Sequence, residues 1–266
     1  MSKVSSYEGW AIITGASSGI GLELAKQIAE EGIHCVLVAR SEDKLIALAE
    51  EIEEEYEVAT LVLALDLATE EGIDALLDGV DDLDISMIVN NAGFGDGGAF
   101  HTRDPERIAE MIKLNCLAPA LITRSLLPYL LERENGAIIT VASILALVPC
   151  PLEATYAATK AFDLSFSEGL AGELKGTGID VLALCPALTE TGFLEAEGMD
   201  EDRIQHIYRK AVPAATIATM ALDALGKCTV IGPRDFKLLS FGRRLLPGKM
   251  INALTAVMSK NLLEID

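Results

Sequence analysis

The sequence predicts one α/β domain: a doubly wound parallel β-sheet of about seven strands, with helices on both faces and a helical C-terminal extension. Apolar runs of strand length alternate with amphipathic segments of helix length along most of the 266 residues. This alternation is typical of parallel sheets that are covered on both faces. A glycine-rich turn joins the first apolar run to the first helix. Because no repeat or linker divides the chain, its length fits a single large domain.

The expected strands and helices follow one another in order. The apolar runs of strand length are residues 11–14, 35–39, 59–65, 87–90, 137–142, 180–185 and 229–232. The helical segments are residues 21–31, 42–55, 70–79, 105–131 and 155–175, of which the fourth is either two helices or one bent helix. Ligands of such sheets bind outside the carboxyl ends of the strands, where the strand order reverses. Gly15, Asn91, Ser143 and Pro186 follow four strands and are therefore expected to converge on one cleft.

The first turn has the pattern of a dinucleotide phosphate loop. It reads Thr14-Gly15-Ala16-Ser17-Ser18-Gly19-Ile20-Gly21 between a strand and a helix. Gly15 permits a tight turn, while Gly19 and Gly21 let the backbone approach a pyrophosphate and let the helix approach the strand. Free N–H groups at the start of the helix then face the phosphates. Ser17, Ser18 and Ile20 complete the expected phosphate-binding set.

A tyrosine and a lysine stand four residues apart in the segment from Tyr156 to Lys160. On a helix they share one face and can touch. A cation beside a phenol favours the phenolate, which brings its pKa toward the range of a proton-transfer catalyst. Alone, such a pair is typical of a solvated helix face. Its meaning here depends on the phosphate loop that precedes it.

Together these motifs resemble those of the short-chain dehydrogenase/reductase family. Further matching pieces stand in the family's order, namely Asp66, the run Asn90-Asn91-Ala92-Gly93, Asn115, Ser143, and Pro186 with Thr191. The resemblance covers residues 9–232, so the family implies a Rossmann-type core there and leaves 233–266 as an extension. Residues 90–98 and 158–178 are most similar to a broad branch of small NADP-dependent reductases.

The resemblance implies a role for each residue of the reaction centre. Tyr156 is the proton donor in reduction and the base in oxidation, and Lys160 lowers its pKa and bonds the nicotinamide ribose. Ser143 polarises the substrate carbonyl as charge develops on its oxygen. Asn115 resembles the family's buried asparagine that supports a bound water and a proton relay to Lys160.

Cofactor choice depends on the residue that closes the second strand. An acidic residue there favours NAD, because its charge repels a 2′-phosphate. This chain has Arg40 and Ser41 instead. A guanidinium pairs with phosphate and stacks on adenine, so the sequence predicts NADP(H) rather than NAD(H). The alternative is that Arg40 is only a solvated residue at the start of a helix.

The resemblance also assigns the rest of the cofactor site. Asp66 and Leu67 flank the adenine, although Asp66 could instead cap the helix that follows, with Thr69 and Glu70. The remaining residues of the set bind the ribose and the nicotinamide carboxamide, and they are Asn91, Ala92, Gly93, Tyr156, Lys160, Pro186, Thr189 and Thr191. The family usually has Pro-Gly after the sixth strand, whereas this chain has Ala187, which cannot freely adopt a positive φ.

Composition excludes several classes of protein. The net charge of −20 argues against nucleic-acid binding, which needs clustered Lys and Arg. The five cysteines have no C-x-x-C pairing and stand in or beside apolar runs, so buried free thiols and a cytoplasmic location are expected. The three histidines are scattered without a metal-binding motif, so no metal site is expected.

The substrate side is expected to border residues 94–100, 144–152 and 188–209. These segments are mostly apolar and offer no fixed cation for a carboxylate, including Ile144, Leu145, Leu147, Val148, Leu152, Phe193 and Leu194. A hydrophobic ketone or aldehyde, or its alcohol, is the expected substrate, unless these residues are core or subunit interface. A second enzyme hypothesis is reduction of a 3-oxoacyl group on a carrier. A non-catalytic NADP-binding sensor or scaffold is the alternative of another class.

Two expectations concern contacts outside the core. Family members usually pair through two helices, which predicts a homodimer or homotetramer whose interface includes Leu117, Leu121, Leu164, Phe166 and Leu170. The tail 236–263 reads as two amphipathic segments that are broken at Pro247-Gly248. Residues 227–266 carry seven Lys/Arg and three Asp/Glu, a charge of +4 that leaves −24 for the rest. Packing or a lid role is favoured over contact with an anionic membrane, which would repel the acidic body.

Overall fold

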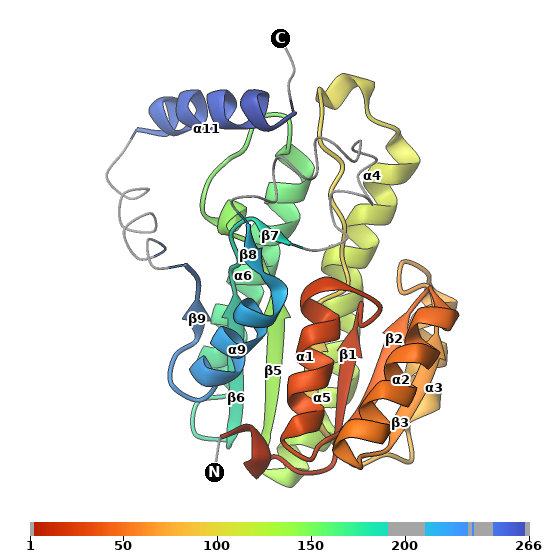
Figure 1. The fold of residues 1–266 in the computed structure, drawn as a ribbon. Coiled ribbons are helices and arrows are strands. Elements are labelled where there is room, and N and C mark those ends of the chain that lie inside the picture. Colours follow the sequence, from red (N-terminus) through yellow and green to blue (C-terminus); the bar gives the residue numbers. More distant parts are fainter. Residues whose placement is uncertain (1–2, 191–210, 234–235, 237–246, 264–266) are drawn as a thin grey trace.

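The computed structural model describes residues 3–190, 211–233, 236 and 247–263 (Figure 1). Seven parallel strands form the sheet in the order β3-β2-β1-β4-β5-β6-β9. They are β1 Trp10–Thr14, β2 His34–Ala39, β3 Thr60–Ala64, β4 Ile85–Asn90, β5 Gly136–Val141, β6 Ile179–Leu184 and β9 Val230–Ile231. Two short strands, β7 Thr189–Glu190 and β8 Val212–Pro213, pair separately. The predicted doubly wound sheet is confirmed.

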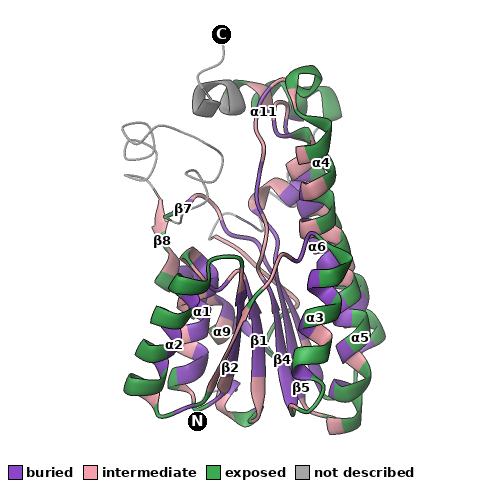
Figure 2. Ribbon diagram, turned by 90° about the vertical axis from the view of Figure 1, so that its right-hand side faces the viewer, coloured by how far each residue is buried: buried purple, intermediate pink, exposed green. Residues whose placement is uncertain are grey.

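The helices cover both faces of this sheet. Helices α1 Gly19–Glu30, α2 Glu42–Tyr56 and α9 Ala214–Ala224 pack on one face. Helices α3 Glu70–Val80, α5 Ala118–Arg133 and α6 Ala154–Glu173 pack on the other. In Figure 2 the buried residues concentrate in the strands, and the exposed ones lie along the outer sides of the helices. This burial on both faces explains why the strand sequences are continuously apolar rather than alternating.

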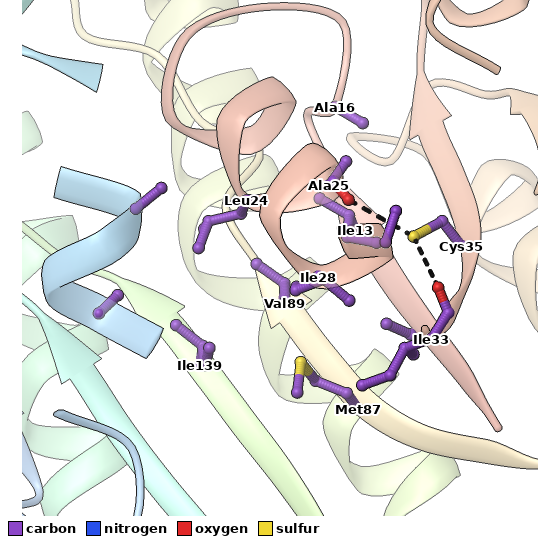
Figure 3. Packing of buried hydrophobic residues seen from close by; sticks show 14 of the residues in the cluster. Ile13, Ala16, Leu24, Ala25, Ile28, Ile33, Cys35, Met87, Val89 and Ile139 are labelled. Carbon is purple, nitrogen blue, oxygen red and sulfur yellow. Dashed lines mark hydrogen bonds between the residues drawn. The ribbon is translucent and has the colours of Figure 1, made fainter. Parts of the chain in front are cut away.

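The first face is filled by branched aliphatic side chains. Ile13, Leu24, Ile28, Val89 and Ile139 are in one cluster between α1 and the central strands (Figure 3). Cys35 lies in the same cluster, where its thiol contacts the carbonyl oxygens of Ala25 and Ile33 at 3.7 and 3.6 Å. All five cysteines are free. The expectation that each is buried is wrong for Cys228, which is exposed, and Cys116 is only partly buried.

The expected helical segment 105–131 is not one regular helix. Helix α4 Pro105–Ile112 continues through a π-helical turn, η3 Lys113–Leu117, into α5. The stretch Pro105–Arg133 is long and apolar enough by composition to cross a membrane. However, α5 buries Ile122, Leu126 and Leu130 against the sheet, so it is a core helix of this domain.

Helix α9 is absent from the sequence-based expectations. Its sequence, AATIATMALDA, favours a helix through its alanines. The buried stripe, however, consists mainly of Ala218, Ala221 and Ala224 beside Ile217. Because alanine is only slightly more hydrophobic than its polar neighbours, the stripe gives a weak amphipathic pattern. Small side chains suit this position because α9 packs directly on α1.

Only part of the expected subunit interface is available on the surface. Leu117 and Leu121 are exposed, as is Phe162 on α6. Leu164 and Leu170 are buried in core clusters, so their assignment to an interface is wrong. They occupy inward positions of α6 where that helix packs on the sheet. Pairing of two chains through these helices stays a prediction.

The tail contributes one further helix, α11 Gly248–Leu263, which lies beyond β7 and β8 at one end of the molecule (Figure 1). Ile251 is buried, and the hydroxyl of Thr255 donates to the carbonyl oxygen of Pro149 at 2.9 Å. Phe236 joins a cluster with Ala146 and Leu147. The tail therefore packs on the loop after β5, and the first amphipathic segment lies mostly outside the described residues.

The strand order reverses between β1 and β4, and a polar brace holds the two strands together there. The Thr14 hydroxyl donates to the Val89 carbonyl oxygen at 3.1 Å and accepts from the N–H groups of Asn91 and Ala92 at 2.9 and 3.0 Å. The Asn91 amide donates to the carbonyl oxygens of Thr14 and Gly15 at 2.9 and 3.2 Å. The carboxyl ends of β1 and β4 are thus fixed relative to each other.

Replacement of Thr14 by valine is expected to destabilise the fold. The variant keeps the shape of the side chain but leaves two backbone N–H groups without their acceptor, which costs about 1–3 kcal/mol. Urea unfolding followed by circular dichroism measures the loss. Thr14→Ser is the matched control, because it keeps the hydroxyl and loses only one methyl group. If valine were as stable as serine, the brace would be unimportant for stability.

Candidate active site

The glycine turn leaves space for a ligand and for close packing. Gly15 and Gly19 have φ values of +68° and +58°. A Cβ on Gly21 would lie 2.3 Å from the Gly15 carbonyl oxygen, and one on Gly15 would lie 2.7 Å from the Asn91 amide nitrogen. Ser18 precedes α1 and makes no capping hydrogen bond to it. The first turn of α1 therefore keeps N–H groups for an anion, and the loop fits a dinucleotide pyrophosphate.

Some residues of the predicted phosphate set face the core instead. Ile20 is 8% exposed and packs in the core, so its side chain anchors α1, and only its backbone faces the loop. Ser17 and Gly19 are partly buried, whereas Ser18 is exposed.

Arg40 and Ser41 follow β2 at the same edge of the sheet. The Arg40 side chain is 62% exposed and lies 3.5 Å from a Glu110 carboxylate oxygen. Glu110 also pairs with Arg107 at 3.0 Å, so it is not dedicated to Arg40. Ser41 precedes α2 without capping it. Both side chains are thus available to a phosphate group at the end of β2.

The segment after β3 distinguishes the two interpretations of Asp66. The Thr69 hydroxyl accepts from the Gly72 N–H at 3.0 Å and caps α3. The Asp66 carboxylate accepts from the Ala68 N–H at 3.0 Å, within its own turn. Asp66 is therefore not the cap of this helix. Leu67 is buried beside it, at 4% exposure.

The loop after β6 carries the expected nicotinamide-binding residues. The Pro186 carbonyl oxygen accepts from the Ile144 N–H at 2.9 Å, which ties this loop to the one after β5. Ala187 is not among the residues with positive φ, so the loop follows a path that alanine tolerates. The Thr189 hydroxyl donates to the Ala187 carbonyl oxygen at 2.9 Å. Thr191, Phe193 and Leu194 lie outside the described residues.

Ser143 and Tyr156 lie on neighbouring elements. Ser143 follows β5 and begins a short 3-10 helix, η4 Ile144–Leu147, which packs on α6. Its hydroxyl oxygen accepts from the Leu145 N–H at 3.1 Å, which leaves its O–H able to donate. Tyr156 is partly buried in the first turn of α6. The Lys160 ammonium lies 5.9 Å from the centroid of the Tyr156 ring.

Lys160 is buried, and its ammonium is held by two acceptors. Its Nζ donates to the Val141 carbonyl oxygen at 2.7 Å and to an Asp163 carboxylate oxygen at 3.0 Å. Burial lowers the pKa of Lys160, but the Asp163 carboxylate and Tyr156 raise it by more, so the net pKa lies above its ordinary value. Lys160 is therefore an ammonium at neutral pH. One of its three N–H groups remains for a cofactor hydroxyl or water.

Asn115 lies in the π-helical turn and is 1% exposed. Its amide oxygen accepts from the Phe94 N–H at 3.2 Å, and its amide nitrogen donates to the Phe94 carbonyl oxygen at 3.0 Å and the Thr159 hydroxyl at 3.1 Å. The side chain thus joins the loop after β4 to α6. It packs at Gly93, where a Cβ would lie 3.0 Å from the Asn115 amide oxygen. The support of a bound water by Asn115 stays a prediction.

Two acidic residues of this region were missed from the sequence. Asp163 stands three residues after Lys160 on the same helix face, and this spacing was a readable signal in an otherwise apolar segment. Glu153 precedes α6 at 6% exposure, between Asp96 and Arg103. Nothing in its local sequence separates it from a solvated helix start. Leu152, just before it, has a φ of 69°, which is rare for a branched residue.

A sequence profile described as short chain dehydrogenase matches residues 9–202. The chain belongs to the short-chain dehydrogenase family. The family binds nicotinamide cofactors. The glycine turn, and the polar brace where the strand order reverses between β1 and β4, fit that use. The predicted family and fold are confirmed, and with them the general class of oxidoreductase.

Curated relatives carry a more specific name. The chain is 40% identical over 183 residues to the very-long-chain 3-oxoacyl-CoA reductase of Meyerozyma guilliermondii, which covers 65% of this chain and 54% of the relative. It is 32% identical over 216 residues to the mouse protein of that name, covering 79% of this chain and 69% of the relative. The chain thus matches little more than half of the yeast protein's length.

Solved structures share the architecture over nearly the whole chain. A 7β-hydroxysteroid dehydrogenase superposes with a TM-score of 0.86 at 25% identity, covering 96% of this chain and 99% of that one. A Sphingobium yanoikuyae short-chain dehydrogenase in complex with NADPH gives 0.81 at 31% identity, with 88% and 93% covered. A Burkholderia phymatum enzyme in complex with NAD gives 0.80 at 25% identity, with 90% and 93% covered.

Glu153 gives the stability of the site region a pH dependence. Burial and the nearby Asp96 raise the pKa of Glu153 to about 7, and Arg103 offsets part of that rise. A raised pKa in the folded state means that stability is present at low pH and is lost as the pH rises through about 7. Glu153→Gln, which cannot ionise, should therefore match the parent at pH ~4, below the pKa of an unfolded glutamate, and exceed it by about 3 kcal/mol at pH ~8.

Chemical unfolding at the two pH values measures this difference. Glu168→Gln is the control, because Glu168 is exposed on the same helix. An equal effect of Glu153→Gln at both pH values would mean that Glu153 is ionised throughout and that its environment is more polar than its burial indicates.

Proposed function

We propose that this protein is an NADP(H)-dependent reductase of hydrophobic carbonyl compounds in which Tyr156, Lys160 and Ser143 form the reaction centre. The observation that carries the proposal is the buried Lys160 ammonium beside Tyr156, at the sheet edge that also holds the glycine turn. The names of the relatives direct the first substrate tests to 3-oxoacyl-CoA thioesters. The alcohol is the product of reduction, and the same centre runs oxidation in reverse.

Each residue has a distinct task in this proposal. Tyr156 donates a proton to the substrate oxygen, and the Ser143 O–H donates a hydrogen bond to that oxygen as negative charge develops there. The Lys160 ammonium lowers the pKa of the Tyr156 phenol by its charge and holds a cofactor hydroxyl with its remaining N–H. When bound, the nicotinamide supplies the hydride. Asn115 holds the loop after β4 against α6 and so fixes the position of Lys160.

The walls of the substrate side support a hydrophobic substrate. Ile144, Leu145, Val148 and Leu152 are partly exposed in the loop between β5 and α6. Leu147, by contrast, is buried in the cluster with Phe236, so it is core rather than pocket wall. The partly exposed members form an apolar border next to Ser143, which suits an acyl chain or a bulky ketone better than a small charged metabolite.

Tyr156→Phe is expected to lower turnover by about 10²–10⁴-fold, because it removes the proton donor. Affinity for NADPH should stay within about twofold of the parent, since the ring remains in place. NADPH oxidation with 3-oxoacyl-CoA thioesters and a panel of hydrophobic ketones gives the rate, and quenching of intrinsic fluorescence gives the affinity. Tyr129→Phe, a change on exposed α5 surface, is the control. Full activity of Tyr156→Phe would refute the proposed mechanism.

The proposed preference for NADP(H) rests on Arg40. Its exposed guanidinium stands at the end of β2, where the acidic residue of NAD-specific sites is absent. Arg40→Ala should weaken NADPH by roughly 10–100-fold and leave NADH nearly unchanged, because only NADPH carries the 2′-phosphate. Equilibrium titration with each cofactor tests this, with Lys44→Ala as a control for loss of charge nearby. Equal loss for both cofactors would show a structural role for Arg40.

A further inference from the structure

A small cavity is lined by Lys160 and Asp163. Its volume is about 10 Å³, close to what one water molecule requires. Polar residues of several elements line it, namely Thr14, Asn90, Asn115, Thr140, Lys160 and Asp163. The cavity is therefore built from β1, β4, β5, the π-helical turn and α6.

Three buried oxygen atoms of these lining residues have no hydrogen-bond partner among the residues that the structure describes. They are Asn90 Oδ1, Thr140 Oγ1 and Asp163 Oδ1. The three residues are 5%, 1% and 2% exposed. Bulk water does not reach them, and a buried polar atom without a partner is costly. Their concentration around one cavity indicates a common ligand.

The hydrogen-bonding capacity of one water molecule matches the needs of the three atoms. Asn90 already donates through its amide nitrogen to Thr123 at 3.0 Å, so its oxygen needs a donor. Asp163 accepts from Lys160 with one carboxylate oxygen, so the other oxygen needs a donor too. A water supplies two donors to these atoms and accepts from the Thr140 hydroxyl. Both donors of the Asn115 amide are used elsewhere, so this side chain does not supply a donor to these atoms.

The water would hold Asp163 in place as the counter-ion of Lys160. Burial raises the pKa of Asp163, and the Lys160 ammonium offsets part of that rise. The other titratable groups around the pair are Tyr156 on α6, Cys116 in η3 and Cys185 just after β6. Burial raises the thiol pKa values of Cys116 to about 11 and of Cys185 to about 12, so both are neutral. Asp163 is thus the group that balances the charge of Lys160.

We propose that Asp163, held by a buried water between Asn90 and Thr140, is a positioning residue that neutralises Lys160 and keeps Tyr156 protonated to higher pH. Tyr156, Lys160 and Asp163 stand at successive turns of one helix face, with the lysine between the two acids. An unpaired ammonium lowers the pKa of a neighbouring phenol. An ammonium paired with a carboxylate has no net charge and lowers that pKa less. The pair therefore favours Tyr156 as a proton donor, which biases the centre toward carbonyl reduction. This inference rests on the proposed function.

Asp163→Asn tests the charge without changing the size of the side chain. At a separation of about 10 Å and an effective dielectric constant of about 20, loss of the carboxylate should lower the titration midpoint of Tyr156 by about one pH unit. The basic limb of the pH–rate profile for reduction should move to lower pH by the same amount. The ultraviolet difference absorbance of the phenolate in the cofactor-free protein, with Tyr156→Phe as reference, should move with it.

Two further measurements separate charge from packing. Asp163→Glu restores the charge and should restore most of the midpoint, whereas a purely structural role would leave it displaced. A high-resolution crystal structure of the parent should show an ordered water within hydrogen-bonding distance of all three oxygen atoms. Thr140→Val removes one partner of this water, so the water should be lost or less ordered in a crystal of that variant. An unmoved or raised midpoint in Asp163→Asn, or a parent crystal without that water, would overturn the proposal.

The phenol titration needs no turnover, so it also separates the two proposals. If Tyr156→Phe keeps full activity, the reaction mechanism fails, yet the titration of Tyr156 still reports whether Asp163 controls its proton. If Tyr156→Phe is inactive and Asp163→Asn leaves the titration unchanged, only the role of Asp163 fails.

Discussion

The reversal of strand order between β1 and β4 is the constraint on which the candidate site depends. Two parallel strands that are neighbours in space but separated by two others in sequence leave a crevice at their carboxyl ends. Here Thr14 and Asn91 close the base of that crevice with hydrogen bonds that are 2.9–3.2 Å long. The glycine turn, the loop after β4 and the π-helical turn are then positioned against one another. A cofactor meets a frame that is rigid before it binds.

A buried ammonium imposes the second constraint. Lys160 can remain charged in the interior only if acceptors compensate for lost hydration. The Val141 carbonyl oxygen and Asp163 provide that compensation from β5 and from the same helix. Asp163 is itself buried, so its second oxygen requires a partner in turn. The buried charge of Lys160 therefore accounts for a polar cavity lined by Asn90 and Thr140 beside an otherwise apolar sheet.

The frame was predictable from the sequence, whereas the compensating groups were not. Continuous apolar strands and a Gly15–Gly21 turn carry local signals, so sheet order and phosphate loop follow from pattern and chirality. Helix α9 was missed because the hydrophobicity of alanine differs little from that of its polar neighbours. Leu164 and Leu170 were assigned to the wrong surface because an apolar helix face can pack either on its own sheet or on another subunit. Asp163 and Glu153 depend on burial, which arises only when distant segments pack together. The sequence alone does not show whether a charged side chain is buried or exposed to water.

The two halves of the site differ in what determines them. The proposed cofactor half consists of glycines, backbone N–H groups and strand ends, so the path of the main chain determines it. The proposed substrate half consists of the loop after β5, where Leu152 adopts a positive φ, and the tail packs on this loop through Thr255 and Phe236. The Thr255 hydroxyl thus ties α11 to the loop that begins at Ser143. If this loop borders the substrate as proposed, residues outside the seven-stranded sheet contribute to substrate choice, whereas the proposed reaction centre lies at the end of β5 and on α6.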